Sequence, residues 1–78
     1  MVMQYEEFKR LCLEDLTRIC PRASRDELVE LLNDEEYRDL LEDYYNLGVE
    51  RYVKAGKHDN ELAFRYCIST VTWNLSMM

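Results

Sequence analysis

Carboxylates are the side chains in this sequence whose types and spacing could do chemistry. Between positions 34 and 55 they recur at intervals that predict one shared helix face: Glu35, Asp39, Glu42, Asp43 and Glu50. Carboxylates three and four residues apart on a helix stand roughly 5 to 6 Å from one another. Such a row could ligate a metal ion, or it could attract a positively charged partner.

The remaining sequence argues against metal binding and catalysis. A di-iron site in a helix bundle needs a Glu-x-x-His motif on each of two helices, and His58 is the only histidine. It lies among polar residues and is predicted to be a solvated turn residue, with a proton-transfer role as the alternative. Gly48 and Gly56 are too few for a phosphate-binding or dinucleotide-binding loop, and no calcium-loop pattern occurs. We therefore expect no enzyme, no cofactor and no metal site.

The three cysteines do not change this expectation. Cys12, Cys20 and Cys67 are odd in number and contain no CxxC pair, so neither a disulfide framework nor a complete zinc site is indicated. Each falls on a predicted apolar face. The sequence therefore predicts reduced thiols that serve as small core residues, with a reactive or metal-ligating cysteine as the alternative.

Charge is distributed unevenly along the chain. Residues 1–50 hold 14 acidic against 6 basic residues, residues 51–78 hold 2 against 4, and the formal net charge is −6. Between Asp26 and Asp43 nine acids accompany a single base, Arg38. Such a block repels nucleic acid, so we expect no direct binding to DNA or RNA.

The acidic face has two interpretations. It could be a solvated surface that keeps a small domain soluble, or it could dock a protein partner that has a basic surface. The run from position 34 to 50 extends for about 24 Å at 1.5 Å per residue, which is loosely commensurate with a phosphate backbone. A domain of this kind could occupy the nucleic-acid groove of another protein and accelerate its own arrival by electrostatic steering.

Tyrosine supplies a second candidate contact. Tyr44 and Tyr45 are adjacent, so about 100° of helix separates them and both cannot point into the centre of one small core. We expect at least one of the two at the rim of the domain, with Tyr45 as the candidate contact for a partner, because tyrosine covers much interface area at little entropic cost. The alternative is a half-buried ring whose hydroxyl reaches water.

The elements that would position these residues are four helices, at about 3–20, 24–33, 34–55 and 59–76. Apolar residues recur at spacings of three and four in each. Pro21 ends the first helix, Ser24 and Glu27 form a capping box for the second, and Gly56 provides a left-handed stop for the third. Two alternatives remain: 24–55 could be one kinked helix, and the β-branched stretch 68–75 could be a strand.

Part of this region resembles the helix hairpin of a tetratricopeptide repeat. Tyr44, Leu47 and Gly48 match the aromatic-x-x-Leu-Gly opening of such a repeat, over about 30 residues. Glu61 and Arg51 depart from the pattern, where the repeat has an alanine and an aromatic residue, and only one copy is present. The resemblance implies two antiparallel helices that pack closely.

At 78 residues the chain is predicted to be a single helical domain, residues 1–78. The expected fold is all-α, a small up-and-down bundle of three to four helices with the acidic helix at its centre. No segment is apolar enough to span a membrane and the first residues do not form a secretory signal, so we expect no membrane association and a cytoplasmic location.

The two ends of the chain are apolar. If the first and last helices are neighbours, these residues would form one patch that could support a homodimer, the alternative being a disordered tail: Met1, Met3, Trp73, Met77 and Met78. The expected function is a non-catalytic protein-interaction module that binds a protein through the acidic helix and Tyr45. The alternative is a nucleic-acid-mimicking inhibitor of a DNA- or RNA-binding enzyme, of the kind that phage and other mobile elements encode.

Overall fold

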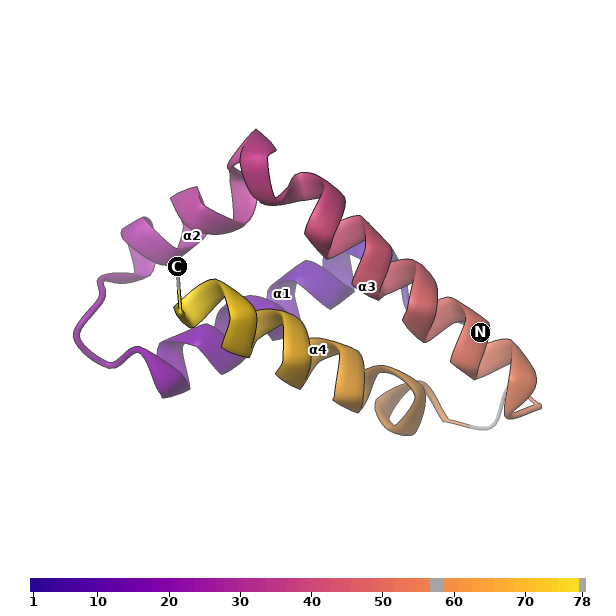
Figure 1. The fold of residues 1–78 in the computed structure, drawn as a ribbon. Helices are drawn as coiled ribbons and strands as arrows, with labels where there is room; N and C mark the ends of the chain where they lie inside the picture. Colours follow the sequence, from indigo (N-terminus) through magenta and orange to yellow (C-terminus); the bar gives the residue numbers. More distant parts are fainter. Residues whose placement is uncertain (57–58, 78) are drawn as a thin grey trace.

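Four helices make up most of the described part of the chain, and together they confirm the predicted all-α bundle. The computed structural model describes residues 1–56 and 59–77. The helices are α1 (Tyr5–Ile19), α2 (Arg25–Asn33), α3 (Glu35–Lys54) and α4 (Asn60–Ser76) (Figure 1). No strand occurs in the described ranges, and the β-branched stretch 68–75 lies inside α4. The predicted turn residue His58 falls outside the described residues.

Local side chains set most helix ends, as the sequence predicts. The Ser24 hydroxyl caps α2 by accepting a hydrogen bond from the Glu27 N–H at 3.2 Å, and the Glu27 carboxylate accepts from the Ser24 hydroxyl, where a full capping box would have the Ser24 N–H as the donor. The Asp59 carboxylate caps α4 by accepting from the Glu61 N–H at 2.9 Å. Gly56 follows the end of α3 with a φ of 77°, the left-handed conformation that glycine adopts without strain.

The junction between α2 and α3 is a single residue. Asp34 is extended (φ −69°, ψ 129°), so the chain from 24 to 55 forms two helices and not one kinked helix. Its N–H is bonded to the Leu31 carbonyl at the end of α2, and its carboxylate accepts from the Glu36 N–H at the start of α3. Asn33, the other candidate cap, instead donates to the Val29 carbonyl.

Helix α4 lies at the centre of the bundle, and the expectation of a central acidic helix is wrong. The α4 helix packs against both α1 and α3, while α1 and α3 have few contacts with each other. Its buried side chains outnumber those of the other helices: Ala63, Phe64, Cys67, Val71, Thr72 and Leu75. The physical reason is charge, because α4 carries only Glu61 and Arg65, both exposed, and can bury more of its side chains at little desolvation cost.

Two hydrogen bonds define the direction of α1 relative to α4. The Met3 N–H donates to the Asn60 side chain at the start of α4, and Thr72 near its end donates to the Asp15 carboxylate. Both pairs are 57 residues apart, so α1 and α4 run parallel. Helices α2 and α3 connect α1 to α4 and lead the chain back to the end of the bundle where α1 begins. Helix α3 is therefore antiparallel to α4 (Figure 1).

This parallel arrangement overturns the expected single patch of terminal methionines. Met1 and Met3 lie at the end of the molecule where α4 begins, because the Asn60 side chain donates to the Met1 carbonyl and accepts from the Met3 N–H. Trp73 and Met77 lie at the other end of α4. These two side chains are separated from Met1 and Met3 by more than ten residues of α4, which is about 20 Å at 1.5 Å per residue.

An aromatic cluster occupies the core at the junction of α1, α3 and α4. Phe8 and Phe64 are fully buried, and their ring centroids are 5.9 Å apart. Tyr45 contacts both, with centroid distances of 5.6 and 5.7 Å. Gly48 is buried beside this cluster, and a Cβ there would overlap the Phe64 ring. The absence of a side chain at Gly48 therefore permits the close approach of α3 and α4.

Candidate interaction surface

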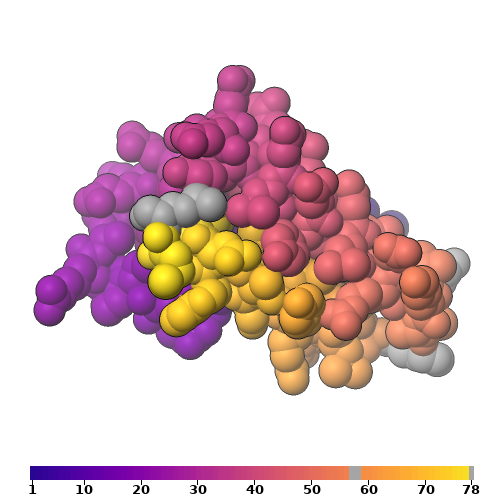
Figure 2. Space-filling model, viewed as in Figure 1, coloured from indigo at the N-terminus to yellow at the C-terminus, as the bar shows by residue number. Residues whose placement is uncertain are grey.

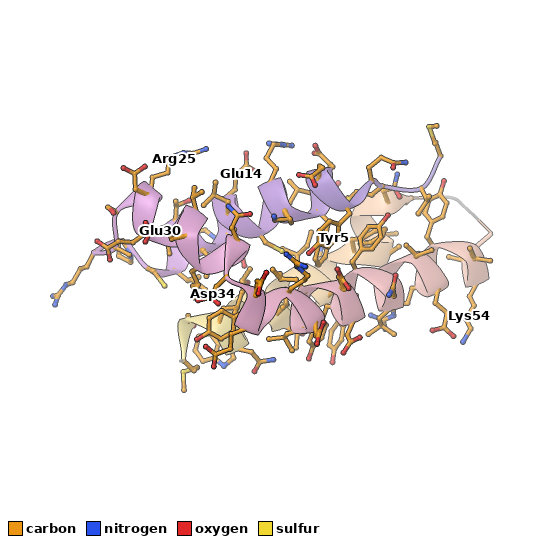
Figure 3. The ribbon with its side chains drawn as sticks, turned by 90° about the horizontal axis from the view of Figure 1, so that it is seen from above. Tyr5, Glu14, Arg25, Glu30, Asp34 and Lys54 are labelled. Carbon is orange, nitrogen blue, oxygen red and sulfur yellow. The ribbon has the colours of Figure 1, made fainter. Side chains whose placement is uncertain are left out.

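The packing of α3 determines which of its sides reaches solvent. Leu41 is fully buried, Tyr52 is 4% exposed and Gly48 is buried, so these residues mark the inner face of the helix. All five predicted site carboxylates lie on the opposite, exposed face: Glu35, Asp39, Glu42, Asp43 and Glu50. We call these five residues the acidic row. Figure 3 labels Asp34 and Lys54, which lie just beyond the two ends of the row.

The two ends of the acidic row are partly neutralised. Glu35 has an Arg38 nitrogen 3.9 Å from its carboxylate, and Glu50 has the Lys54 ammonium at 3.4 Å. Both pairs are well exposed, and pairs of this kind contribute between nothing and about 1 kcal/mol. They reduce the local charge without fixing the side chains.

The middle of the row carries concentrated negative charge. Among the described residues, Asp39, Glu42 and Asp43 have neither an ion pair nor a side-chain hydrogen bond. Asp39 is three residues from Glu42 and four from Asp43, so the three carboxylates are neighbours on the helix surface. We call them the acidic triplet. Like charges at these spacings destabilise a helix by roughly 0.2–0.5 kcal/mol per pair, which a bound cation would relieve.

A shallow hollow lies beside the triplet, where the start of α1 meets α2 and α3. Tyr5, Lys9, Arg38 and Glu42 contribute to its lining. The Lys9 ammonium lies 5.8 Å from the Tyr5 ring centroid and donates to the Asn33 side chain at 2.7 Å. Burial, and then the charge of Glu42, raise the pKa of the Tyr5 hydroxyl, so this group is neutral at physiological pH. Figure 3 shows Tyr5 between α1 and α3.

Tyr45 lies inside the bundle. Its ring is half-buried against Tyr5, Phe8 and Phe64, and its hydroxyl donates to the Met3 carbonyl at 2.6 Å. This hydrogen bond holds the segment before α1 against the middle of α3. The structure thus gives Tyr45 a packing role that is separate from the acidic row, which lies on the outer face of the same helix.

Neither the cysteines nor any cluster of potential metal ligands forms a reactive or metal-binding site within the described ranges. Cys12 and Cys67 are buried and Cys20 is half-buried, and all three are free thiols. Burial, followed by the nearby Asp15 carboxylate, raises the pKa of the Cys12 thiol to about 12, and burial also raises the pKa of Cys67. Residues 1–56 and 59–77 contain no group of three or more His, Cys, Asp or Glu residues arranged to hold a metal ion.

One exposed feature was predicted only in part, because Trp73 and Met77 were expected in an apolar patch but Leu62 and Tyr66 were not included in it. Helix α4 carries large apolar side chains on the side that faces away from the core, namely Leu62, Tyr66, Trp73 and Met77. The sequence signal was available, because α4 carries apolar side chains on more of its circumference than the buried face alone requires, with Glu61, Arg65 and Ser69 on its polar side.

Comparison of the chain with protein-family models, with curated proteins and with solved structures finds no match. The resemblance to a tetratricopeptide hairpin is accordingly limited to the close, antiparallel packing of α3 and α4 at Gly48. No helix in the described part of the chain combines the length and apolar character that a membrane crossing requires. The function therefore has to be inferred from the surface itself.

Proposed function

We propose that the protein is a non-catalytic interaction module that binds a basic surface of a partner protein through the acidic row of α3. The observation that carries this proposal is the acidic triplet, Asp39, Glu42 and Asp43. These carboxylates are exposed, adjacent and unpaired among the described residues. A row of fixed negative charge raises the association rate with a basic partner and selects against acidic ones.

The rigidity of the row supports this function. The triplet lies in the middle of a 20-residue helix, and the inner face of that helix is held by Leu41, Gly48 and Tyr52. A charged row on a packed helix is pre-organised, so binding requires ordering of side chains only and not of the backbone. The segment is thus better suited to docking than an acidic disordered tail would be.

A mimic of nucleic acid is the second candidate, and the length of the row favours it. From Glu35 to Glu50 the acidic row extends for about 22 Å at 1.5 Å per residue, with four exposed carboxylates between positions 35 and 43 and the fifth at position 50. A mimic would bind in the nucleic-acid groove of a DNA- or RNA-binding enzyme and inhibit it. The two candidates share the same residues and differ in the identity of the partner surface.

Capture of partners from the native cell tests the proposal. The bait is the full chain, compared with a variant in which Asp39→Asn, Glu42→Gln and Asp43→Asn remove the triplet charge. The matched control is Glu6→Gln, Glu14→Gln and Glu30→Gln, which removes the same charge from exposed positions on α1 and α2. We expect a partner that the wild type and the control capture and that the triplet variant loses.

Salt and nucleic acid then separate the two candidates. Binding through the row should weaken at least tenfold between about 0.05 and 0.5 M NaCl, because the Debye length shortens to less than the spacing of the charges. If the protein is a mimic, duplex DNA or RNA displaces it from the captured partner, and nuclease treatment of the lysate increases capture. Binding that is independent of salt and of the triplet would contradict both candidates.

A further inference from the structure

The exposed side of α4 forms a continuous apolar stripe. Leu62, Tyr66, Trp73 and Met77 are 66%, 53%, 60% and 71% exposed. At 100° per residue these four positions fall within about 60° of the helix circumference, so they form one line along α4. We call this line the outer stripe. A contiguous line of large exposed apolar side chains is typical of a surface that another protein covers, which indicates that a partner surface packs here.

The spacing of the outer stripe is symmetric. Its residues are separated by four, seven and four positions, so the order of intervals is the same when read from either end. The midpoint falls between the small residues Ser69 and Thr70. Suppose that a second copy of α4 is placed antiparallel with its midpoint over that of the first. Leu62 of each copy then faces Met77 of the other, and Tyr66 of each faces Trp73 of the other. The small residues at the crossing point allow the two helices to approach closely.

The charges that flank the stripe on α3 reverse along its length. Arg51 and Lys54 lie beside Leu62 and Tyr66 in a shallow groove, and the Arg51 guanidinium is 4.8 Å from the Tyr66 ring centroid. The acidic half of α3 runs beside the other half of α4, because α3 and α4 are antiparallel and the Asn74 side chain donates to Tyr44. In an antiparallel pair of copies, the basic end of each α3 therefore meets the acidic end of the other.

From these observations we propose that the protein forms a twofold homodimer through the outer stripe, with the two α4 helices antiparallel. A twofold interface places the same patch on both subunits, and a stripe with symmetric spacing and reversing charge is complementary to itself. An unrelated partner would require neither property. In Figure 2, α4, in orange to yellow, is open to solvent beside α3.

The dimer goes beyond the proposed docking function and does not depend on it. The acidic triplet lies on the outer side of α3, whereas the outer stripe belongs to α4, so both surfaces can be occupied at once. Dimerisation would present two acidic rows in one particle. Mutation of the outer stripe leaves partner binding by the triplet measurable, because no apolar residue of the stripe belongs to the acidic row.

Molar mass in solution tests the dimer directly. Sedimentation equilibrium of the full chain should show a shift from 9.4 kDa to twice that mass as the concentration rises from about 1 µM to 1 mM. Trp73 is the only tryptophan, so its fluorescence emission should shift to shorter wavelength over the same range as the indole leaves water. A protein that remains monomeric at 1 mM overturns the proposal.

Two variants locate the interface on the outer stripe. Trp73→Glu and, independently, Leu62→Glu should abolish the dimer while leaving the helical circular dichroism unchanged, since both side chains are exposed. The matched control is Val53→Glu, at an α3 position that is 56% exposed and borders a hollow lined by residues of the N-terminus. A dimer that survives both stripe variants and is lost in Val53→Glu overturns the assignment of this surface.

Cross-linking then establishes the direction of the helices. In a Cys20→Ser background, Ser69→Cys should form a disulfide with itself across the twofold axis under mild oxidation. Leu62→Cys alone should not form one, but a mixture of Leu62→Cys and Met77→Cys should yield a mixed disulfide. Efficient self-linking of Leu62→Cys would indicate a parallel pair and would overturn the antiparallel arrangement.

Discussion

Gly48 occupies a position in the middle of α3 where the Phe64 ring fills the space that a Cβ would need. Alanine favours a helix over glycine by about 1 kcal/mol, so propensity alone predicts that Gly48→Ala stabilises the protein. Overpacking of a core typically costs 1–3 kcal/mol and opposes this gain. We expect Gly48→Ala to lower the free energy of unfolding by about 1–2 kcal/mol, measured by urea titration with circular dichroism.

Asn46→Ala provides the control for this substitution, because position 46 is exposed on the same helix. It should change the free energy of unfolding by less than about 0.5 kcal/mol. If the clash is the cause, Phe64→Leu should reduce the effect of Gly48→Ala in a double-mutant cycle. Equal or greater stability of Gly48→Ala would mean that α3 and α4 are not in close contact at this point.

Burial of Cys12 predicts a loss of stability at alkaline pH. Its pKa is raised from 9.0 to about 12 in the folded protein, so the unfolded chain loses this proton first. The contribution is therefore fully present below pH 9 and is lost as the pH rises toward 12. At pH 11 the expected loss from this thiol is about 2–3 kcal/mol.

Unfolding midpoints measured between pH 8 and pH 11 check this expectation. Cys12→Ala leaves unfilled space in the core, so its stability at pH 8 should be lower than that of the wild type. Because it lacks the ionisable thiol, its further decline toward pH 11 should be shallower. Burial raises the pKa of Cys67 and Tyr5 as well, so part of the decline remains in the variant. Identical slopes would show that the Cys12 thiol is accessible to water in the folded state.

At the scale of elements, the helices themselves were predictable from sequence. Their ends depend on short-range hydrogen bonds, such as those at Ser24 and Asp59, and on the left-handed Gly56. The predicted ranges 24–33 and 34–55 agree with α2 and α3 to within one residue. The choice between Asn33 and Asp34 as the cap was not predictable, because both side chains are suitable and the Lys9 contact of Asn33 comes from α1.

Asp34 ends one helix and begins the next, so Asp34→Ala tests this junction. Loss of an N-cap side chain typically costs 0.5–2 kcal/mol. We expect a decrease of about 1 kcal/mol in the free energy of unfolding, while Asp34→Asn, which keeps an acceptor oxygen, should lose less than half of that. Urea titrations of the two variants provide the measurement. Equal losses in both would indicate that charge at the helix N-terminus, and not the hydrogen bond, is responsible.

At the scale of the whole molecule, the relative placement of helices could not be read from the sequence. Periodicity shows that α1 and α4 each have a buried face, but it does not set their direction. The parallel pairing depends on contacts between residues 57 positions apart, such as Thr72 with Asp15. For the same reason the exposure of the acidic row was predictable, whereas the separation of Met1 from Trp73 and the central position of α4 were not.

The charge of the whole molecule gives the acidic triplet a measurable effect on stability. With a net charge of −6, and with neighbouring carboxylates unpaired in the described structure, the folded state contains repulsion that unfolding relieves. We expect the variant with Asp39→Asn, Glu42→Gln and Asp43→Asn to be more stable than the wild type by about 0.5–1 kcal/mol at about 0.02 M NaCl. Thermal unfolding by calorimetry measures this difference.

Salt distinguishes local repulsion from the effect of net charge. The advantage of the triplet variant should largely disappear at about 0.5 M NaCl, where exposed charges are screened over a few Å. The control variant Glu6→Gln, Glu14→Gln and Glu30→Gln has the same net charge but loses the pairing of Glu14 with Arg10, so its gain should be smaller.

A triplet variant that is less stable than the wild type at low salt would show that these carboxylates support the fold. Stabilisation together with loss of the captured partner would show that the triplet opposes folding and is present for binding.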